Sequence, residues 1–156
     1  MEKEIRFNDV PRWWALCFNE LCAMKEHCLR HRVAAAVPAT QRQALCVTPA
    51  ARTARSCSMY VEATPVLVAR GFDGAFQRLQ SRDARHDLRL SLTRYFGSRG
   101  SYYRYKHGEC ILTPRQQQAV LSHFGRYGYQ RDVFDSQYYD YCFEMPADGE
   151  NSQRMG

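Results

Sequence analysis

Apolar side chains recur every three to four residues in four stretches of the chain, which is the spacing of one buried helix face. The stretches expected to be helical are residues 20–36, 65–79, 83–96 and 114–127. Thr64 and Thr113 each precede a proline, a combination typical of a helix start. Thr113 also has the capping-box spacing to Gln116. Residues 66–68 fit a β-strand as well, so that alternative stays open.

A different pattern, in which tyrosines alternate with polar and basic side chains, begins at residue 101. Alternation is the pattern of a β-strand. His107 and Gly108 suit a tight turn, after which the chain would return as a second strand. We therefore predict a β-hairpin over residues 101–112. Residues 43–48 and 138–143 are further strand candidates.

Together these elements predict an α+β fold, with three to four helices packed on a small, mainly antiparallel sheet that includes the hairpin. A chain of 156 residues is expected to form one domain, here over residues 1–145, with a cysteine-bearing part at 17–57 and a flexible tail at 146–156. The residues expected in the core are Phe72, Phe76, Leu88, Leu92, Phe96, Val120, Leu121 and Phe124.

The cellular compartment follows from the apolar runs. No such run approaches the roughly 20 residues that a membrane-spanning helix needs. The first ten residues contain no apolar stretch typical of a secretory signal. We therefore expect a cytoplasmic protein without a membrane partner. In a reducing cytosol the seven cysteines are expected as thiols or metal ligands rather than as disulfides.

Four of these cysteines have spacings that could bring their sulfurs to one metal ion, with zinc favoured over an iron–sulfur cluster. They are Cys17, Cys22, Cys28 and Cys57. Four residues separate the first two, which fits a zinc site; the longer gap to the third requires that any helix begins after Cys22. His27 and His31 could substitute as ligands or be ordinary surface histidines. The alternative for the cysteines is a role as small buried side chains.

Charge is distributed unevenly along the chain. Residues 66–131 carry twelve basic and four acidic side chains, whereas residues 132–156 carry one basic and six acidic ones. A basic segment of this kind could bind a polyanion. The alternatives are that the acidic end neutralises it, or that the arginines form an ordinary solvated surface.

Basic and aromatic residues are also interleaved within the basic segment. Arginine and lysine neutralise phosphates, and tyrosine rings offer stacking faces to bases. The candidate nucleic-acid-binding residues are Arg82, Arg85, Arg89, Arg94, Arg99, Tyr102, Tyr103, Arg104, Tyr105 and Lys106. The order helix, helix, hairpin would place the first three on a recognition helix, as in a winged-helix arrangement. Tyrosines also pack well on strands, so a structural role is the alternative.

Catalytic signatures are absent from the sequence. Residues 107–110 hold a His, a Glu and a Cys, but nucleophilic catalysis usually needs Cys and His to approach each other from separate elements. No P-loop, dinucleotide-binding, zinc-protease or serine-hydrolase motif occurs. The sequence favours a non-catalytic protein and leaves an enzyme open.

Several short motifs occur together in the order found in one family of proteins. They are Cys17-x4-Cys22-x5-Cys28-Leu29-Arg30, Cys57, Tyr95-Phe96-Gly97, Tyr102-Tyr103-Arg104 and Leu112-Thr113-Pro114-x-Gln116-Gln117. Over most of residues 13–143 the chain thereby resembles a family of small proteins of unknown function from anaerobic gut bacteria. The resemblance implies a bacterial cytosolic protein with no assigned activity. The family tends to have proline after the second cysteine, where this chain has Ala23.

The leading functional hypothesis is a small binding module whose basic-aromatic face engages nucleic acid or an acidic partner. The alternative is a structural metal-binding scaffold, held together by the cysteine cluster, with an interaction role and no catalytic activity.

Overall fold

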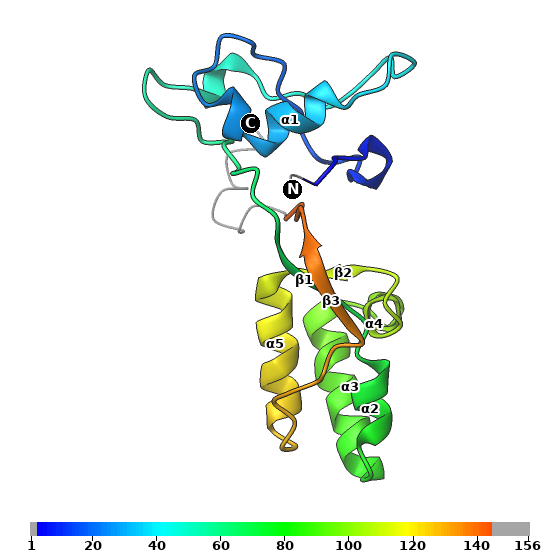
Figure 1. The fold of residues 1–156 in the computed structure, drawn as a ribbon. Helices are drawn as coiled ribbons and strands as arrows, with labels where there is room; N and C mark the ends of the chain where they lie inside the picture. Colours follow the sequence, from blue (N-terminus) through cyan, green and yellow to red (C-terminus); the bar gives the residue numbers. More distant parts are fainter. Residues whose placement is uncertain (1–2, 145–156) are drawn as a thin grey trace. The chain divides into compact units, whose positions relative to one another are not determined.

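The computed structural model describes residues 3–144, and these divide into two compact units (Figure 1). One unit contains residues 3–65 and 143–144, and the second contains residues 66–142. The single domain expected over residues 1–145 stays a prediction. The tail expected at residues 146–156 lies outside the described residues.

The second unit contains a three-stranded antiparallel sheet with the strand order β2-β1-β3 (Figure 1). Its strands are β1, Val66–Arg70; β2, Ile111–Leu112; and β3, Ser136–Asp140. The central strand is β1, in which Ala69 pairs with Leu112 on one side and with Gln137 on the other. The predicted α+β fold class is confirmed. The strand alternative for residues 66–68 is right, and β3 overlaps the strand expected at 138–143.

The chain leaves β1 through Gly71, whose φ of +69° lies in a region that side chains rarely adopt. A Cβ added to Gly71 would collide with the side chain of Asp135. The Asp135 carboxylate accepts hydrogen bonds from the backbone N–H groups of Asp73 and Gly74, both at 3.1 Å, where the next helix starts. The helix expected over residues 65–79 is therefore wrong in its first half, because strand pairing and this turn occupy it.

Four helices accompany the sheet. They are α2, Asp73–Arg78; α3, Arg82–Phe96; α4, Arg99–Lys106; and α5, Pro114–Gly125. Helix α5 packs against β1 and β2, and α3 packs against both α5 and α4 (Figure 1). The helices expected at 83–96 and 114–127 are confirmed to within two residues at each end. The capping box between Thr113 and Gln116 is present.

The hairpin expected over residues 101–112 is wrong, because most of this segment forms helix α4. The Ser98 hydroxyl accepts a hydrogen bond from the backbone N–H of Ser101 at 3.1 Å and so caps the helix. Tyr102 and Lys106, four residues apart, then share its buried side. Alternating tyrosines and basic residues fit a helix as well as a strand, and within this segment only β2 joins the sheet.

One hydrophobic cluster fills the second unit. Its buried members are Ala69, Phe72, Ala75, Phe76, Leu79, Leu88, Leu92, Tyr102, Leu112, Val120, Phe124 and Val133. The ring centroid of Phe72 lies 5.9 Å from that of Phe124 and 6.1 Å from that of Tyr102. Six of the eight predicted core residues belong to the cluster, and the other two, Phe96 and Leu121, are partly buried against it. The prediction of which faces of α3 and α5 are buried is therefore right.

The first unit has less regular structure. It contains one α-helix, α1, Leu29–Ala35, and short 3-10 turns at Phe7–Asp9, Lys25–His27 and Pro49–Ala51. The helix expected over 20–36 thus begins only at Leu29, because turns occupy the residues before it. The strand expected at 43–48 is wrong: within the described residues, that segment forms one isolated bridge, between Leu16 and Cys46.

The core of the first unit is formed around Trp14, which is buried. Its ring meets the ring of Phe143 edge-on at 5.1 Å and lies 4.0 Å from the guanidinium carbon of Arg30. Arg30 and the preceding Leu29 are buried on α1. Among residues 3–144, no helix has the length and apolar character needed to cross a membrane.

Candidate functional site

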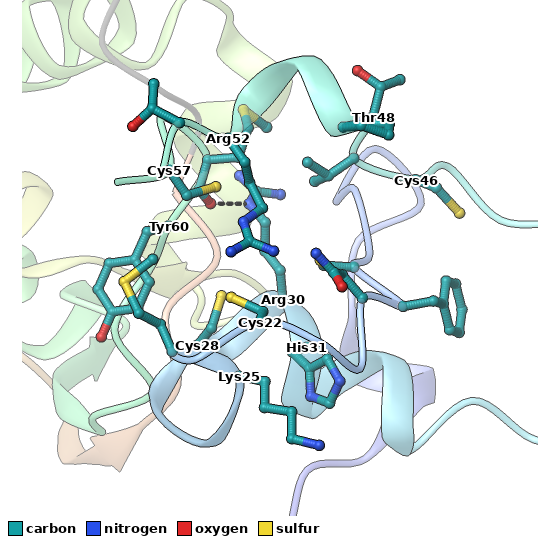
Figure 2. Close-up of a pocket in the computed structure, with 18 residues that line it drawn as sticks. Cys22, Lys25, Cys28, Arg30, His31, Cys46, Thr48, Arg52, Cys57 and Tyr60 are labelled. Carbon is teal, nitrogen blue, oxygen red and sulfur yellow. Dashed lines mark hydrogen bonds between the residues drawn. The ribbon is translucent and has the colours of Figure 1, made fainter. Parts of the chain in front are cut away.

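The first unit contains a cavity of about 550 Å³ formed by residues 17–60 (Figure 2). All four cysteines predicted as metal ligands line it: Cys17, Cys22, Cys28 and Cys57. The thiols of Cys22, Cys28 and Cys57 point into the cavity, whereas that of Cys46, a fifth lining cysteine, points away. The four cysteines singled out by their spacing therefore line one cavity, together with Cys46, and their role as metal ligands stays a prediction.

Backbone hydrogen bonds position these cysteines. The backbone N–H of Cys17 donates to the carbonyl of Arg30 at 3.2 Å, which joins the first cysteine to α1. Cys28 ends a 3-10 turn and forms a bridge with Glu62, and Cys57 forms a bridge with Arg52. The site is thus assembled from three separate segments of the chain.

The cysteines do not form a coordination sphere. In the described part of the chain, no three His, Cys, Asp or Glu side chains are arranged so that they could hold a metal ion. Cys28 is buried, while Cys17, Cys22 and Cys57 are partly exposed to the cavity. Of the two histidines proposed as substitute ligands, only His31 lines the cavity.

The remaining lining consists of cationic, apolar and neutral polar residues, and none of the residues lining this cavity is acidic. Lys25 and His31 both contact Glu20, at 3.1 Å each, and the hydrogen bond from Lys25, followed by that from His31, lowers the pKa of the Glu20 carboxyl. Glu20 therefore offsets the positive charge of Lys25, and also that of His31 when the imidazole is protonated. The two arginines of the cavity, Arg30 and Arg52, were not predicted from the sequence.

These two arginines differ in how their donors are used. Arg30 donates from Nε to the Met59 carbonyl at 2.7 Å and from Nη1 to the Ala15 carbonyl at 2.8 Å. The Nε atom of Arg52 is buried and has no hydrogen-bond acceptor among the described residues. Its guanidinium is directed toward the thiols of Cys22 and Cys28 (Figure 2).

In the second unit, some of the predicted nucleic-acid-binding residues converge on Tyr103. The guanidinium carbon of Arg99 lies 5.8 Å from the Tyr103 ring centroid, and the ring of His107 stacks on Tyr103 at 5.8 Å. A hydrogen bond from Arg99, together with the charges of Arg99, Arg89 and Lys106, lowers the pKa of the Tyr103 hydroxyl against a smaller opposing effect of burial. Two helices, α3 and α4, therefore contribute cations to one tyrosine.

Other predicted residues have structural roles instead. Tyr102 is fully buried, and burial raises the pKa of its hydroxyl, so its ring offers no face to a base. The Tyr105 ring stacks on Phe96 at 4.4 Å. Lys106 is buried, forms an ion pair of 3.2 Å with Asp73 and lies over the Phe76 ring.

The remaining arginines lie on exposed or partly exposed helix surfaces. On a regular helix Arg82, Arg85 and Arg89 fall on one side of α3, while Arg94 lies about 140° from Arg89. Arg104 is exposed and faces Glu109 at 3.7 Å. Because His107 stacks on Tyr103 and Glu109 faces Arg104, the His-Glu-Cys sequence at 107–110 shows no catalytic arrangement in the described residues.

Comparisons with known proteins give one assignment. No curated protein and no solved structure matches the chain. The family described as "Family of unknown function (DUF6078)" matches residues 1–143 of the 156. The predicted resemblance to a family without an assigned function is confirmed, and the chain belongs to DUF6078.

Proposed function

We propose that this protein is a non-catalytic cytoplasmic binding protein that engages single-stranded nucleic acid through a surface centred on Tyr103. This Tyr103 surface consists of Arg89, Arg99, Tyr103 and His107, together with Arg85, which lies one helical turn before Arg89 on the same side of α3. The observation that carries the proposal is that cations from two helices converge on one partly exposed tyrosine ring. Cations neutralise phosphates while an aromatic ring stacks on a base, and single-strand binding combines these two contacts.

The charge of the Tyr103 surface is available to a ligand. Within residues 3–144, no carboxylate lies at ion-pair distance from Arg85, Arg89 or Arg99. The contacts of the first two are neutral: Arg85 donates to the Gln80 carbonyl, and Arg89 contacts His86 Nδ1 at 3.2 Å. In contrast, the Asp73 carboxylate offsets the charge of Lys106. An anionic ligand would therefore meet uncompensated positive charge at Tyr103 rather than along the whole of α4.

The fold favours a single strand over a duplex. The expected winged-helix arrangement needed a hairpin as a wing, and helix α4 occupies that position. The Tyr103 and His107 rings already lie nearly parallel, with an interplanar angle of 12°. A base placed on the outer face of either ring would extend this stack without a change in the backbone, and such stacking tolerates any base.

Fluorescence anisotropy with a labelled single-stranded DNA of mixed sequence tests the proposal. We expect affinity to fall steeply with salt, because binding releases condensed counterions. Arg89→Gln and Arg99→Gln should each reduce the slope of log affinity against log salt by about 0.7, the value for one phosphate contact on a single strand. The matched control is Arg94→Gln, on the same helix but on another side, which should leave the slope unchanged.

Two further arms separate the rivals. One alternative is that the acidic end of the chain covers the basic segment. Asp135 already accepts hydrogen bonds at the start of α2, so the other acidic residues would have to cover the segment. A chain ending at residue 144 keeps β3 and removes only residues outside the described part, so it tests the rest of the acidic end. Binding of labelled polyglutamate, but not DNA, would replace nucleic acid with an acidic protein partner. Absence of DNA binding by both chain lengths would overturn the proposal.

A further inference from the structure

The cysteine cavity holds a combination of groups that the Tyr103 surface does not use. Its lining brings together thiols from three chain segments and the guanidinium groups of Arg30 and Arg52, without any carboxylate. Cysteine thiolates are the preferred ligands of soft and borderline ions such as Zn²⁺. We propose that this cavity is a thiolate metal site for a d¹⁰ ion such as Zn²⁺, and that Arg52 donates a hydrogen bond to the metal-bound thiolates. The site is independent of nucleic-acid binding.

The donor set contains four sulfurs: Cys17, Cys22, Cys28 and Cys57. Four sulfur ligands complete the tetrahedral sphere of a structural zinc site, which leaves no position open for catalysis. Cys46 lies at the rim and points away, so it is not part of the set. Cys110 and Cys142 belong to the second unit. The cavity therefore divides the seven cysteines into four that could share an ion and three that serve as controls.

Charge is the second argument. Zn²⁺ held by four thiolates is a group with two net negative charges, which is costly to bury without nearby cations. Arg30, which is buried, and Arg52 both line the cavity, and Glu20, which is not part of the lining, already contacts Lys25 and His31. The lining thus suits an anionic complex better than a free cation or a neutral molecule.

Arg52 supplies an independent observation. Its Nε is buried without an acceptor among the described residues, and a buried donor left without a partner normally costs about 1–3 kcal/mol. The guanidinium points toward the thiols of Cys22 and Cys28 (Figure 2). A metal-bound thiolate carries full negative charge and would accept this hydrogen bond. Groups that donate to metal ligands in this way orient the ligands and strengthen binding.

Binding requires the thiols to move together, because no three donors are yet arranged around one point in the described residues. The segment between Cys17 and Cys28 can supply this movement: Leu21 is 93% exposed and Phe18 is 54% exposed, so little packing holds the segment in place. Each thiol loses its proton to solvent as it binds, and coordination closes the segment onto α1 and the bridge at Cys57.

The test uses the full-length chain, purified under reducing conditions and stripped of metal. Titration with Co²⁺ or Cd²⁺, followed by thiolate-to-metal charge-transfer absorption, should saturate at one ion per chain, and Zn²⁺ should displace the probe. Cys57→Ser should lower affinity by more than tenfold, whereas Cys46→Ser and Cys110→Ser should leave it unchanged. Arg52→Gln should weaken binding about 10–100-fold with all four thiols still present, the range found for partners of metal ligands.

Circular dichroism of each metal-free variant shows whether it still folds. Cys28 is buried, so Cys28→Ser could disturb the unit by itself; Cys57 and Cys17 are partly exposed and provide the cleaner pair. No charge-transfer band in the reduced wild-type chain would overturn the proposal. So would wild-type affinity in Cys57→Ser and Cys17→Ser. An unchanged affinity in Arg52→Gln alone would remove the role of Arg52 and leave the four-thiolate site.

Discussion

Substitution of Gly71 by alanine tests how the start of α2 is held. The backbone at Gly71 has a φ of +69°, and an added Cβ would collide with the Asp135 carboxylate. Asp135 is exposed and can swing away, but it would then lose its two hydrogen bonds to the N–H groups of Asp73 and Gly74. The substitution therefore combines a local backbone cost with the loss of a helix cap that comes from a distant part of the chain.

The two costs can be estimated separately. A left-handed backbone costs a residue with a side chain roughly 1–2 kcal/mol. Loss of a capping carboxylate costs about 0.5–2 kcal/mol, typically ~1. Gly71→Ala should thus lower the free energy of unfolding by about 2–3 kcal/mol. Gly97 is the matched control, because it has a φ of +86° and nothing within 4 Å of an added Cβ. Gly97→Ala should cost only the backbone part.

Urea unfolding of the full chain, followed by far-ultraviolet circular dichroism, measures both variants, since α2 to α5 hold most of the helical residues described. The decisive comparison is repeated in an Asp135→Ala background, where the carboxyl group that collides with the added Cβ is absent and only the Cβ of residue 135 remains, at 3.2 Å. There, Gly71→Ala should cost no more than Gly97→Ala. Equal costs in the wild-type background, or a cost at Gly71 that Asp135→Ala leaves unchanged, would refute the reasoning.

Three further predictions follow from the second unit. Leu92→Ala should destabilise the protein by about 2–5 kcal/mol through lost burial and a cavity, measured by the same urea unfolding. Burial raises the pKa of Asp73, but the hydrogen bonds from Lys106 and Gln77 and the charges of Lys106 and His107 together outweigh it, so its folded pKa lies below the unfolded value of 3.8. The resulting stabilisation is present above pH 3.8 and lost as pH falls through the folded pKa; Asp73→Asn should flatten the acid limb of a stability–pH profile. In the anisotropy assay Tyr103→Ala should weaken single-strand binding by about 1–3 kcal/mol, whereas Tyr102→Phe, which changes only a buried hydroxyl, should leave it unaltered; equal losses would contradict the roles assigned to the two rings.

Elements whose signals are local were predictable. Helix α5 begins with a threonine, a proline and a glutamine at fixed spacing, and α3 ends at Gly97 in a left-handed conformation. Such signals depend on a few consecutive residues and need no tertiary partner. The buried face of each of these helices was also predictable, because apolar residues such as Leu88 and Leu92 recur at helical spacing.

Elements whose partners are distant were not predictable. Strand β1 exists because β2 and β3 pair with both of its edges, and its residues alone fit a helix or a strand. The tyrosine-rich segment fits either spacing, and the cap supplied by Ser98 selects a helix. At the cavity, four of the five lining cysteines are those singled out by their spacing, but the position of Arg52 depends on its pairing with Cys57. No sequence pattern reports such a pairing.

The central position of β1 has a consequence for synthesis on the ribosome. Strand β1 emerges first, while its partners β2 and β3 follow only at residues 111–112 and 136–140. Until β2 emerges, both edges of the apolar Val-Leu-Val segment are open to other chains, and one edge stays open until β3 emerges. Open edges of this kind promote aggregation. Contacts between such distant residues also form slowly. A chain interrupted before residue 136 should therefore aggregate rather than fold partially, and the nascent protein should depend on chaperones until β3 has left the exit tunnel.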